Sequence, residues 1–443
     1  MPVSSSTEGF PIEGATMPTW LLRFDADGVL ASPATADALM VRLADRSLSH
    51  VIFHSHGWNT DFADALRQYG TFLRALDGVL ATYPLAGFNP IFVGITWPSV
   101  WLAEEPGPTL AGMNTEAATA RIVTDLAAPL AAPARARLYA LADSAHLDPP
   151  AAQELAALLS TAVGGLNDEI GDPAMDAGPT AEDLIEGARR LAAVEGRAAP
   201  ATLAGPPALD ENGLPIASLS GITGRLDPRD LIRLFSLFQM KDRAGRVGAT
   251  GVATLLRRMM AAAPEARFNL LGHSFGAKVM LSAIAAAPAL PRPVDTLLLL
   301  QPAISHLAFA ATVPGRAGPG GYRAVLERVA APVFTTFSAM DMPLHDVFHL
   351  ALRRDADLGE MRIAAAGAPP SRYAALGGYG PRGSGETLID PIPGPGEPLL
   401  YPPGARMVGL DGSANRITSH GDVGTPYTAW VLRHLLALPA ATS

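Results

Sequence analysis

Short apolar runs recur along the chain, and stretches with helical spacing of apolar residues separate them. The six clearest runs cover residues 20–24, 50–57, 90–97, 268–274, 295–302 and 332–340. Several are apolar at consecutive positions, which is typical of strands that are covered on both faces. Strands that alternate with helices favour a parallel sheet with right-handed crossovers. The pattern therefore predicts an α/β fold with a mainly parallel central sheet flanked by helices.

The clearest predicted helix follows the second run. Its apolar residues recur at spacings of three and four: Phe62, Leu66, Tyr69, Leu73 and Leu76. This spacing gives one apolar face along a helix. Three consecutive residues in front of it have side chains suited to capping its N-terminus: Asn59, Thr60 and Asp61.

Residues 102–243 interrupt this alternation, since they contain no good strand and are rich in alanine, leucine and proline. Three short helices are expected there, at residues 117–129, 151–162 and 180–194. The chain is thus divided into a core, residues 19–101 with 244–438, and a helical insertion before the fourth strand. The insertion is either a peripheral addition or a lid over a binding site. Glycine and proline dominate residues 364–405, where we expect long surface loops.

Composition narrows the functional classes. The 443 residues are 49% hydrophobic and 17% charged, with a formal net charge of −9, which suits a chain with a sizeable core. Lys241 and Lys278 are the only lysines and the arginines are scattered, so no nucleic-acid partner is expected. The lack of cysteine excludes disulfides and thiolate chemistry. No secretory signal is visible, and Gln301 and Pro302 break the most apolar run, so we expect a cytoplasmic protein without a membrane span.

A short polar turn lies between the fourth apolar run and a helix-like stretch, in FNLLGHSFGAKVM. His273 and Ser274 stand between Gly272 and Gly276, which allow backbone angles and close approaches that a Cβ would block. The pattern G-x-S-x-G after a strand is typical of a nucleophile elbow, which holds a serine hydroxyl out at the top of a sheet. Ser274 is therefore the candidate nucleophile.

A serine hydroxyl is a poor nucleophile near neutral pH and needs a base within hydrogen-bond reach. His420 lies in RITSHGDVGTPYTAW, a polar loop just before a C-terminal helix, and it is the preferred base. Three other histidines remain as alternatives: His306, His345 and His349. His434 lies inside the final helix and is interpreted as a surface or packing residue.

The oxyanion of an acyl-transfer reaction needs backbone N–H donors. One candidate donor is Phe275, which directly follows the serine. The second is Trp58 in HSHGWN, where Gly57 lets the chain turn inwards. His54 and His56 in the same segment could instead be polar residues at a strand end.

The acid that orients the base should follow a strand at its carboxyl end, because ligands bind at that edge of an open α/β sheet. Asp341 directly follows the apolar run at 332–340 and is the preferred acid, with Asp346 as the second choice. Asp295 precedes its strand and so belongs to the opposite edge. The other aspartates lie in charged or loop-rich sequence or too close to the base: Asp355, Asp357, Asp390, Asp411 and Asp422.

Other chemistries have weaker support. The chain lacks the phosphate-binding motif G-x-x-x-x-G-K-[ST] and the zinc motif H-E-x-x-H. The segment DMPLHDVFHL carries two Asp and two His residues that could bind a metal, but a strand end entering an amphipathic helix explains it more simply. No metal or cofactor is expected. Trp97 and Trp101 lie beside the turn WPS; we assign Trp97 to the core and Trp101 to an apolar pocket.

These residues, in this order, resemble the α/β-hydrolase superfamily, in which a serine follows the fifth strand, an acid follows a later strand and a histidine precedes the last helix. Ser274, Asp341 and His420 match that order, and His56 and Gly57 match the family's oxyanion loop. The segments HGWNTDF, ITWPS and LLGHSFGAKV are similar to a bacterial branch with HG-aromatic-N, WPS and HS-x-G at matching places. The resemblance covers roughly residues 20–101 and 244–438.

The resemblance implies a serine hydrolase that cleaves carboxylic esters of a small-molecule acyl substrate without a cofactor. The substrate would contact four residues: His56, Gly57, Trp101 and His273. Amidases, peptidases, thioesterases and acyltransferases would use the same machinery, and a non-catalytic interaction protein of the same fold is the alternative from another class. The insertion is a departure, because familiar members place their cap after the sixth strand. Substrate identity and oligomeric state are left open.

Overall fold

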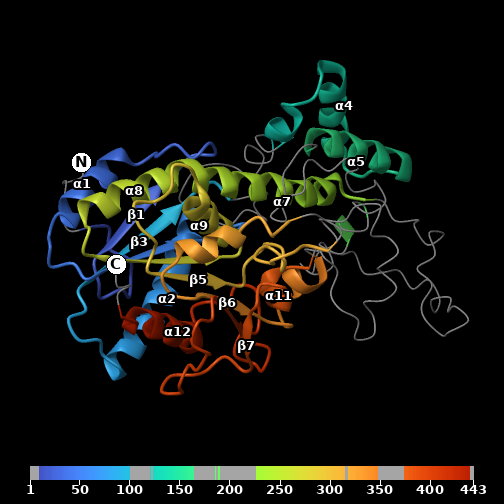
Figure 1. Cartoon of the computed structure of the whole chain (residues 1–443). Coiled ribbons are helices and arrows are strands. Elements are labelled where there is room, and N and C mark those ends of the chain that lie inside the picture. Colours follow the sequence, from blue (N-terminus) through green and yellow to red (C-terminus); the bar gives the residue numbers. More distant parts are fainter. Residues whose placement is uncertain are drawn as a thin grey trace, which may run out of the picture.

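The centre of the protein is one eight-stranded sheet in which every pair of neighbouring strands is parallel (Figure 1). The computed structural model describes residues 9–99, 120, 123–163, 185, 188–189, 226–314, 318–347 and 374–439. The strands are β1 (Thr19–Arg23), β2 (His50–Ser55), β3 (Pro90–Thr96), β4 (Arg267–His273), β5 (Thr296–Leu300), β6 (Val333–Phe337), β7 (Thr387–Ile389) and β8 (Met407–Asp411). Their order across the sheet is β1-β3-β2-β4-β5-β6-β8-β7. The predicted mainly parallel sheet is confirmed, and each of the six apolar runs contains a strand.

Helices cover both faces of the sheet, which explains why its strands are apolar at consecutive positions. The helices are α1 (Pro33–Leu43), α2 (Phe62–Thr82), α4 (Ala132–Ala142), α5 (Pro149–Val163), α7 (Pro228–Val247), α8 (Ala253–Ala262), α9 (Phe275–Ala285), α11 (Leu376–Tyr379) and α12 (Pro426–Ala437). Three shorter elements are the π-helices η2 (Gly248–Val252) and η4 (Pro343–Val347) and the 3₁₀-helix η3 (Arg323–Arg328). No helix in the described ranges has both the length and the apolar character needed to cross a membrane.

Successive residues of the central strands enter two separate cores. Val51 and Phe53 of β2 pack with α1, α8 and α9 on one face, whereas Ile52 packs with α2 and α12 on the other. This follows from the two-residue period of a strand, which points neighbouring side chains to opposite faces. The predicted helix is α2, and Asp61 is its N-cap, since its carboxylate accepts the Asp64 N–H at 2.6 Å.

Helix α7 joins the helical insertion to the sheet. Its first half packs with α4 and α5 in a third apolar cluster, through Leu231, Ile232 and Phe235. Its second half enters the core of the sheet through Met240 and Val247. The expected boundary at residue 243 therefore falls inside one continuous helix. The predicted helix at 151–162 lies within α5, residues 120 and 123–127 are helical as expected for 117–129, and most of 180–194 lies outside the described residues.

The two C-terminal strands were not predicted. β7 has three residues and β8 has five, with Gly409 in its middle, so neither produces a clear apolar run. A Cβ on Gly409 would lie 2.7 Å from the Leu388 side chain and 2.8 Å from that of Pro381, so both pack closely over this glycine. In the described part of residues 364–405, loops dominate as expected, apart from α11 and β7.

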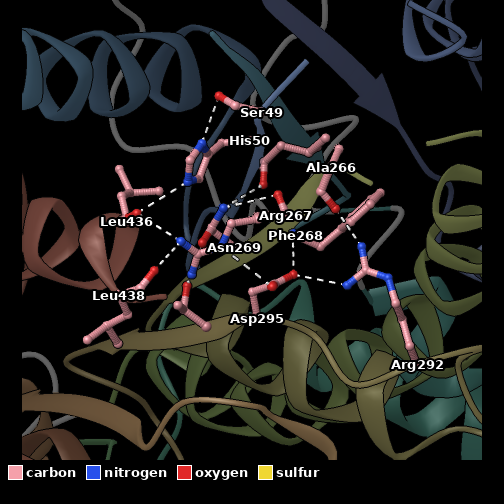
Figure 2. Close-up of polar contacts among 12 residues, drawn as sticks. Ser49, His50, Ala266, Arg267, Phe268, Asn269, Arg292, Asp295, Leu436 and Leu438 are labelled. Atoms are coloured by element: carbon pink, nitrogen blue, oxygen red, sulfur yellow. Dashed lines mark hydrogen bonds and ion pairs between the residues drawn. The ribbon is translucent and has the colours of Figure 1, made fainter. Parts of the chain in front are cut away.

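The amino edge of the sheet is held by buried ion pairs around Asp295 (Figure 2). Its carboxylate accepts the Phe268 N–H at 2.8 Å and lies 3.1 Å from Arg292 Nη1 and 3.5 Å from Arg267 Nε. Arg267 also donates to the carbonyl of Leu436 at 3.0 Å, which ties the end of α12 to the start of β4. Asp295 therefore lies at the edge opposite Ser274, as predicted from its place before β5.

The close packing of η2 on α9 gives a test of the fold. A Cβ on Gly248 would collide with the Val279 carbonyl and lie 2.9 Å from Ser282 Cβ. We expect Gly248→Ala to lower the free energy of unfolding by about 1–3 kcal/mol, the usual cost of overpacking. Thermal and denaturant unfolding would measure it.

Gly78 is the matched control, because it lies in α2 with no atom within 4 Å of the place of a Cβ. Gly78→Ala should raise the free energy of unfolding by about 0.5–1 kcal/mol. If Gly248→Ala is as stable as Gly78→Ala, the described packing of η2 on α9 is wrong.

Candidate active site

Ser274 occupies the sharp turn between β4 and α9. Its backbone has φ 54° and ψ −123°, a conformation that is uncommon for a residue with a side chain and that marks a strained turn. Both neighbouring glycines are needed for close approach. A Cβ on Gly276 would collide with the backbone carbonyl of Ser55, and one on Gly272 would lie 2.6 Å from the Ala277 nitrogen. Ser274 thus lies in a sharp strand-to-helix turn at the carboxyl end of β4, and its role as a nucleophile stays a prediction.

The loop after β2 passes directly beside this serine. A Cβ on Gly57 would lie 2.6 Å from Ser274 Cβ, 3.2 Å from Ser274 Oγ and 3.2 Å from His273 Nδ1. The Phe275 N–H, at the first turn of α9, donates to no acceptor in the described part of the chain. The segments that hold Trp58 and Phe275, the two predicted oxyanion donors, therefore flank the Ser274 hydroxyl from two sides.

The turn WPS (residues 97–99), which follows β3, contacts the loop at residues 56–59. The imidazole of His56 stacks on the indole of Trp97 with centroids 5.6 Å apart and planes within 3°. The Trp97 N–H donates to His56 Nε2 at 3.3 Å, and the Asn59 N–H donates to the Ser99 carbonyl at 2.9 Å. Because His56 is 1% exposed, it lies under the loop, where it supports Gly57; its predicted substrate contact stays a prediction. Trp97 belongs to the core as predicted.

Asp341 and His420 meet across the carboxyl edge of the sheet. Asp341 follows β6, is 0% exposed, and its Oδ2 lies 2.8 Å from Nδ1 of His420. Its other oxygen, Oδ1, accepts the Leu344 N–H at 3.1 Å. The imidazole is 23% exposed. This contact puts the ring proton on Nδ1, so Nε2 is left as the nitrogen that can accept a proton.

Gln301 joins the same pair and was missed by the sequence analysis. It is the residue directly after β5, is 0% exposed and has φ 43°. Its Nε2 lies 2.8 Å from Asp341 Oδ2 and 2.8 Å from the carbonyl oxygen of Ser419. A polar residue directly after a buried apolar strand was the available signal, because that position shares an edge with Ser274 and Asp341.

His273 connects the serine to the Asp–His pair. Its Nε2 donates to the His420 carbonyl at 2.9 Å, and the two rings lie 4.9 Å apart. Burial, together with the neighbouring His420, holds the pKa of His273 well below its ordinary value. Within the described residues, no hydrogen bond joins Ser274 Oγ to His420 itself. The structure thus places the serine beside His273 and pairs only the acid with the base.

The side chains of the alternative bases have other surroundings, although the His345 backbone N–H donates to the Asp341 carbonyl at 2.8 Å. His306 is 4% exposed in the loop after β5, where burial lowers its pKa to about 4. His345 stacks on Tyr379, with ring centroids 4.2 Å apart. His434 is partly buried in α12 against Phe334 and Tyr401, which agrees with a packing role. His349 lies outside the described residues.

Most of the alternative acids have other partners or fall outside the described residues, and Asp390 is exposed directly after β7. Asp422 accepts the N–H and hydroxyl of Thr418 at 3.0 and 3.1 Å, inside the loop that carries His420. Asp411 ends β8 and accepts the Ser413 N–H at 2.8 Å. Asp355, Asp357 and Trp101 are outside the described residues, as is the side chain of Asp346. In the part of the chain that is described, no three His, Asp or Glu side chains form a group able to hold a metal ion.

The arrangement places a serine, a histidine paired with a buried carboxylate, and two backbone segments at one edge of the sheet. A search of family models finds no match to this chain. A comparison with curated proteins also finds no match.

The buried histidines beside the site give a test of its electrostatics. His54 contacts the rings of Tyr69 and Phe72, and burial lowers its pKa to about 3. Neither of its ring nitrogens has a hydrogen-bond partner among the described residues. The unfolded chain takes up this proton as the pH falls through the ordinary value of 6.5, whereas the folded protein does not. Stability should therefore fall below pH 6.5 by about 1.4 kcal/mol per pH unit for this one residue.

His54→Leu should remove this contribution of His54 to the pH dependence. Between pH 7.5 and pH 5.5, the free energy of unfolding of His54→Leu should therefore fall by about 1.4 kcal/mol less than that of the unsubstituted protein. The same substitution at His146, which is exposed, is the matched control. Equal acid sensitivity of His54→Leu and the unsubstituted protein would show that His54 is not held neutral by burial.

Proposed function

We propose that this protein is a serine hydrolase of the α/β-hydrolase fold that cleaves carboxylic esters through an acyl-enzyme. The single observation that carries the proposal is the 2.8 Å contact of His420 Nδ1 with the buried Asp341 carboxylate, at the sheet edge where Ser274 emerges. A neutral imidazole held in this tautomer has its second nitrogen ready to accept a proton. A hydroxyl close by is the group that such a base activates.

In the proposed cycle, Ser274 Oγ attacks the acyl carbon while His420 Nε2 takes the hydroxyl proton. The protonated imidazole then gives this proton to the departing alkoxide, which leaves as an alcohol. Water, deprotonated by His420, attacks the acyl-enzyme, and the carboxylic acid is released with Ser274 restored. Asp341 stabilises the imidazolium that forms in both halves of the cycle and keeps its own charge throughout.

The oxyanion would be held by the Phe275 and Trp58 N–H groups. Support comes from the place of Phe275 at the first turn of α9, where backbone N–H groups have no intrahelical acceptor and the helix dipole favours negative charge. The bracing of the 56–59 loop by the WPS turn supports the second donor, because oxyanion stabilisation requires donors that are fixed before the reaction.

The missing hydrogen bond between Ser274 and His420 is compatible with this cycle. In enzymes without substrate, catalytic hydrogen bonds are often long and tighten only in the complex. His273 Nε2 donates to the His420 carbonyl, and burial holds the pKa of His273 well below its ordinary value, so this neighbour places no second positive charge beside the proposed base.

Two features differ from familiar α/β hydrolases. The serine follows β4, the fourth strand of the described residues, where the resemblance implies the fifth. The helical insertion precedes the nucleophile strand, and we propose that it forms a lid. In support, α7 carries the insertion's apolar cluster at one end and packs on the core at the other, and its Arg243 donates to the Pro98 carbonyl of the WPS turn at 2.9 Å.

The first prediction from this proposal concerns the nucleophile. Ser274→Ala should reduce hydrolysis of a small acetyl ester by orders of magnitude with an unchanged thermal unfolding midpoint, because the alanine keeps the elbow and lacks only the hydroxyl. Ser282→Ala is the control: this serine lies on the same helix α9 and its hydroxyl bonds to Tyr322, away from the site. Unchanged turnover in Ser274→Ala would end the assignment.

The second prediction concerns the orienting acid. Asp341→Asn should keep the fold but lower kcat by about 10³–10⁴, because the amide favours the wrong imidazole tautomer. Asp411→Asn, at the carboxyl end of β8, should keep near-full turnover. The triad must be redrawn if the effects of the two substitutions are reversed.

A further inference from the structure

We propose that Gln301 is a positioning residue that fixes the Asp341 carboxylate and the loop carrying His420 to each other. The inference rests on the proposed function, since it assigns a role within that site. Within the described residues, the hydrogen bonds of Gln301 go to Thr336, Asp341 and Ser419 and not to Ser274 or the predicted oxyanion donors, so it would act through the Asp–His pair.

The side-chain amide of Gln301 has two N–H bonds, and the geometry uses both. One points to Asp341 Oδ2 and the other to the Ser419 carbonyl, each at 2.8 Å. The opposite orientation of the amide would bring its oxygen against a carboxylate and a carbonyl, which both accept and never donate. The two acceptors therefore fix the orientation, and the amide bridges the acid to the residue just before the base.

The backbone conformation of Gln301 directs its side-chain amide toward Asp341 and Ser419. At φ 43°, Gln301 turns sharply out of β5, and its N–H donates to the Thr336 hydroxyl of the neighbouring strand β6 at 3.0 Å. On the other side, a Cβ on Gly377 of α11 would collide with the Gln301 backbone. A conformation this uncommon for a residue with a side chain persists only where the surroundings enforce it. The Gln301 amide, which bridges Asp341 to Ser419, is thus fixed at the carboxyl edge of the sheet.

The Gln301 amide also determines which groups lie next to the Asp341 carboxylate. Asp341 Oδ2 accepts from His420 Nδ1 and from Gln301 Nε2, so one carboxylate oxygen receives two fixed donors. Without the amide, that oxygen and the Ser419 carbonyl would lose the donor between them and repel each other. The loop would then move relative to Asp341 and carry the imidazole with it. A displacement of about 1 Å can lower turnover about 10²-fold.

Gln301 acts here through its two donors. Within the described residues its Oε1 is buried with no hydrogen-bond partner, so the amide contributes through its N–H groups alone. A methionine of similar length would fill the same space but lack both donors. Gln301→Met therefore separates the two hydrogen bonds from space filling.

The kinetic test compares Gln301→Met with Gln153→Met, which makes the same change at an exposed position of α5. For a small acetyl ester, Gln301→Met should lower kcat by about 10–100-fold and leave KM within about twofold, because ground-state binding does not use the bridge. Gln153→Met should match the unsubstituted protein. A kcat for Gln301→Met equal to that of the control would overturn the positioning role.

The spectroscopic test does not depend on turnover. The Nδ1 proton of His420, shared with a carboxylate, should give a downfield proton resonance, assigned by its loss in His420→Asn. In Gln301→Met this resonance should shift, or broaden because the proton exchanges faster with solvent. Gln153→Met should leave the resonance unchanged. An unchanged resonance in a folded Gln301→Met protein would overturn the inference. If no ester is hydrolysed but the resonance responds as expected, the proposed function fails and the bridge stands.

A third measurement covers the case in which Gln301→Met does not fold. In the unsubstituted protein, both side-chain amide protons of Gln301 should exchange slowly with solvent, because both are donated in hydrogen bonds by a side chain that is 0% exposed. The amide of Gln153, which is exposed, should exchange fast and serves as the internal reference. Fast exchange at Gln301 would show that the bridge does not exist in solution.

Discussion

Parallel strands end at the same edge of a sheet, and every group of the candidate site depends on that constraint. Ser274 follows β4, Gln301 follows β5 and Asp341 follows β6, three neighbouring strands in the order of the sheet. None of these residues alone indicates a site, but the register of β4, β5 and β6 places all three near the loop that carries His420. His420 comes from that loop, just before α12, which packs on the opposite face of the sheet from α9. The site thus draws on both layers of the fold.

The buried Asp341 carboxylate determines which groups must lie beside it at the carboxyl edge of the sheet. A charge such as that of Asp341, at 0% exposure, is tolerable only if its oxygens are hydrogen-bonded. The Leu344 N–H, the Gln301 amide and the His420 imidazole provide those bonds at 2.8–3.1 Å. Because the same bonds fix the imidazole, the requirement that stabilises the charge also orients the base. Burial instead favours the neutral form of His273, whose pKa it lowers well below the ordinary value.

Much of the layout could be predicted from the sequence, for identifiable reasons. Apolar runs bounded by polar turns are strong signals, so six strands and the place of Ser274 and Asp341 at strand ends were accessible. The sharp turn at Ser274 could be predicted because Gly272 and Gly276 mark close backbone approaches on both sides. The pairing of Asp341 with His420, 79 residues apart, was predicted from the place of Asp341 after a strand and of His420 in a polar loop before the last helix, and it is present as a direct contact.

Other features depend on packing between distant segments and leave no local signal. β8 owes its place to backbone pairing with β6 and contains Gly409, so its apolar pattern is weak. Gln301 looks like a break in an apolar run, and only the position of β6 beside β5 reveals its partner. The buried place of His56 follows from Trp97, which belongs to another strand end. The roles of residues outside the described ranges, Trp101 among them, stay predictions.

The central claim is that Ser274 is a nucleophile activated by this edge of the sheet. The most direct test is to treat the folded protein with a fluorophosphonate, which phosphonylates activated serines, and to locate the adduct by peptide mass spectrometry. We predict one stoichiometric adduct, on the peptide that carries Ser274. No adduct at all, or an adduct on Ser282 or Ser305 instead, would contradict the account.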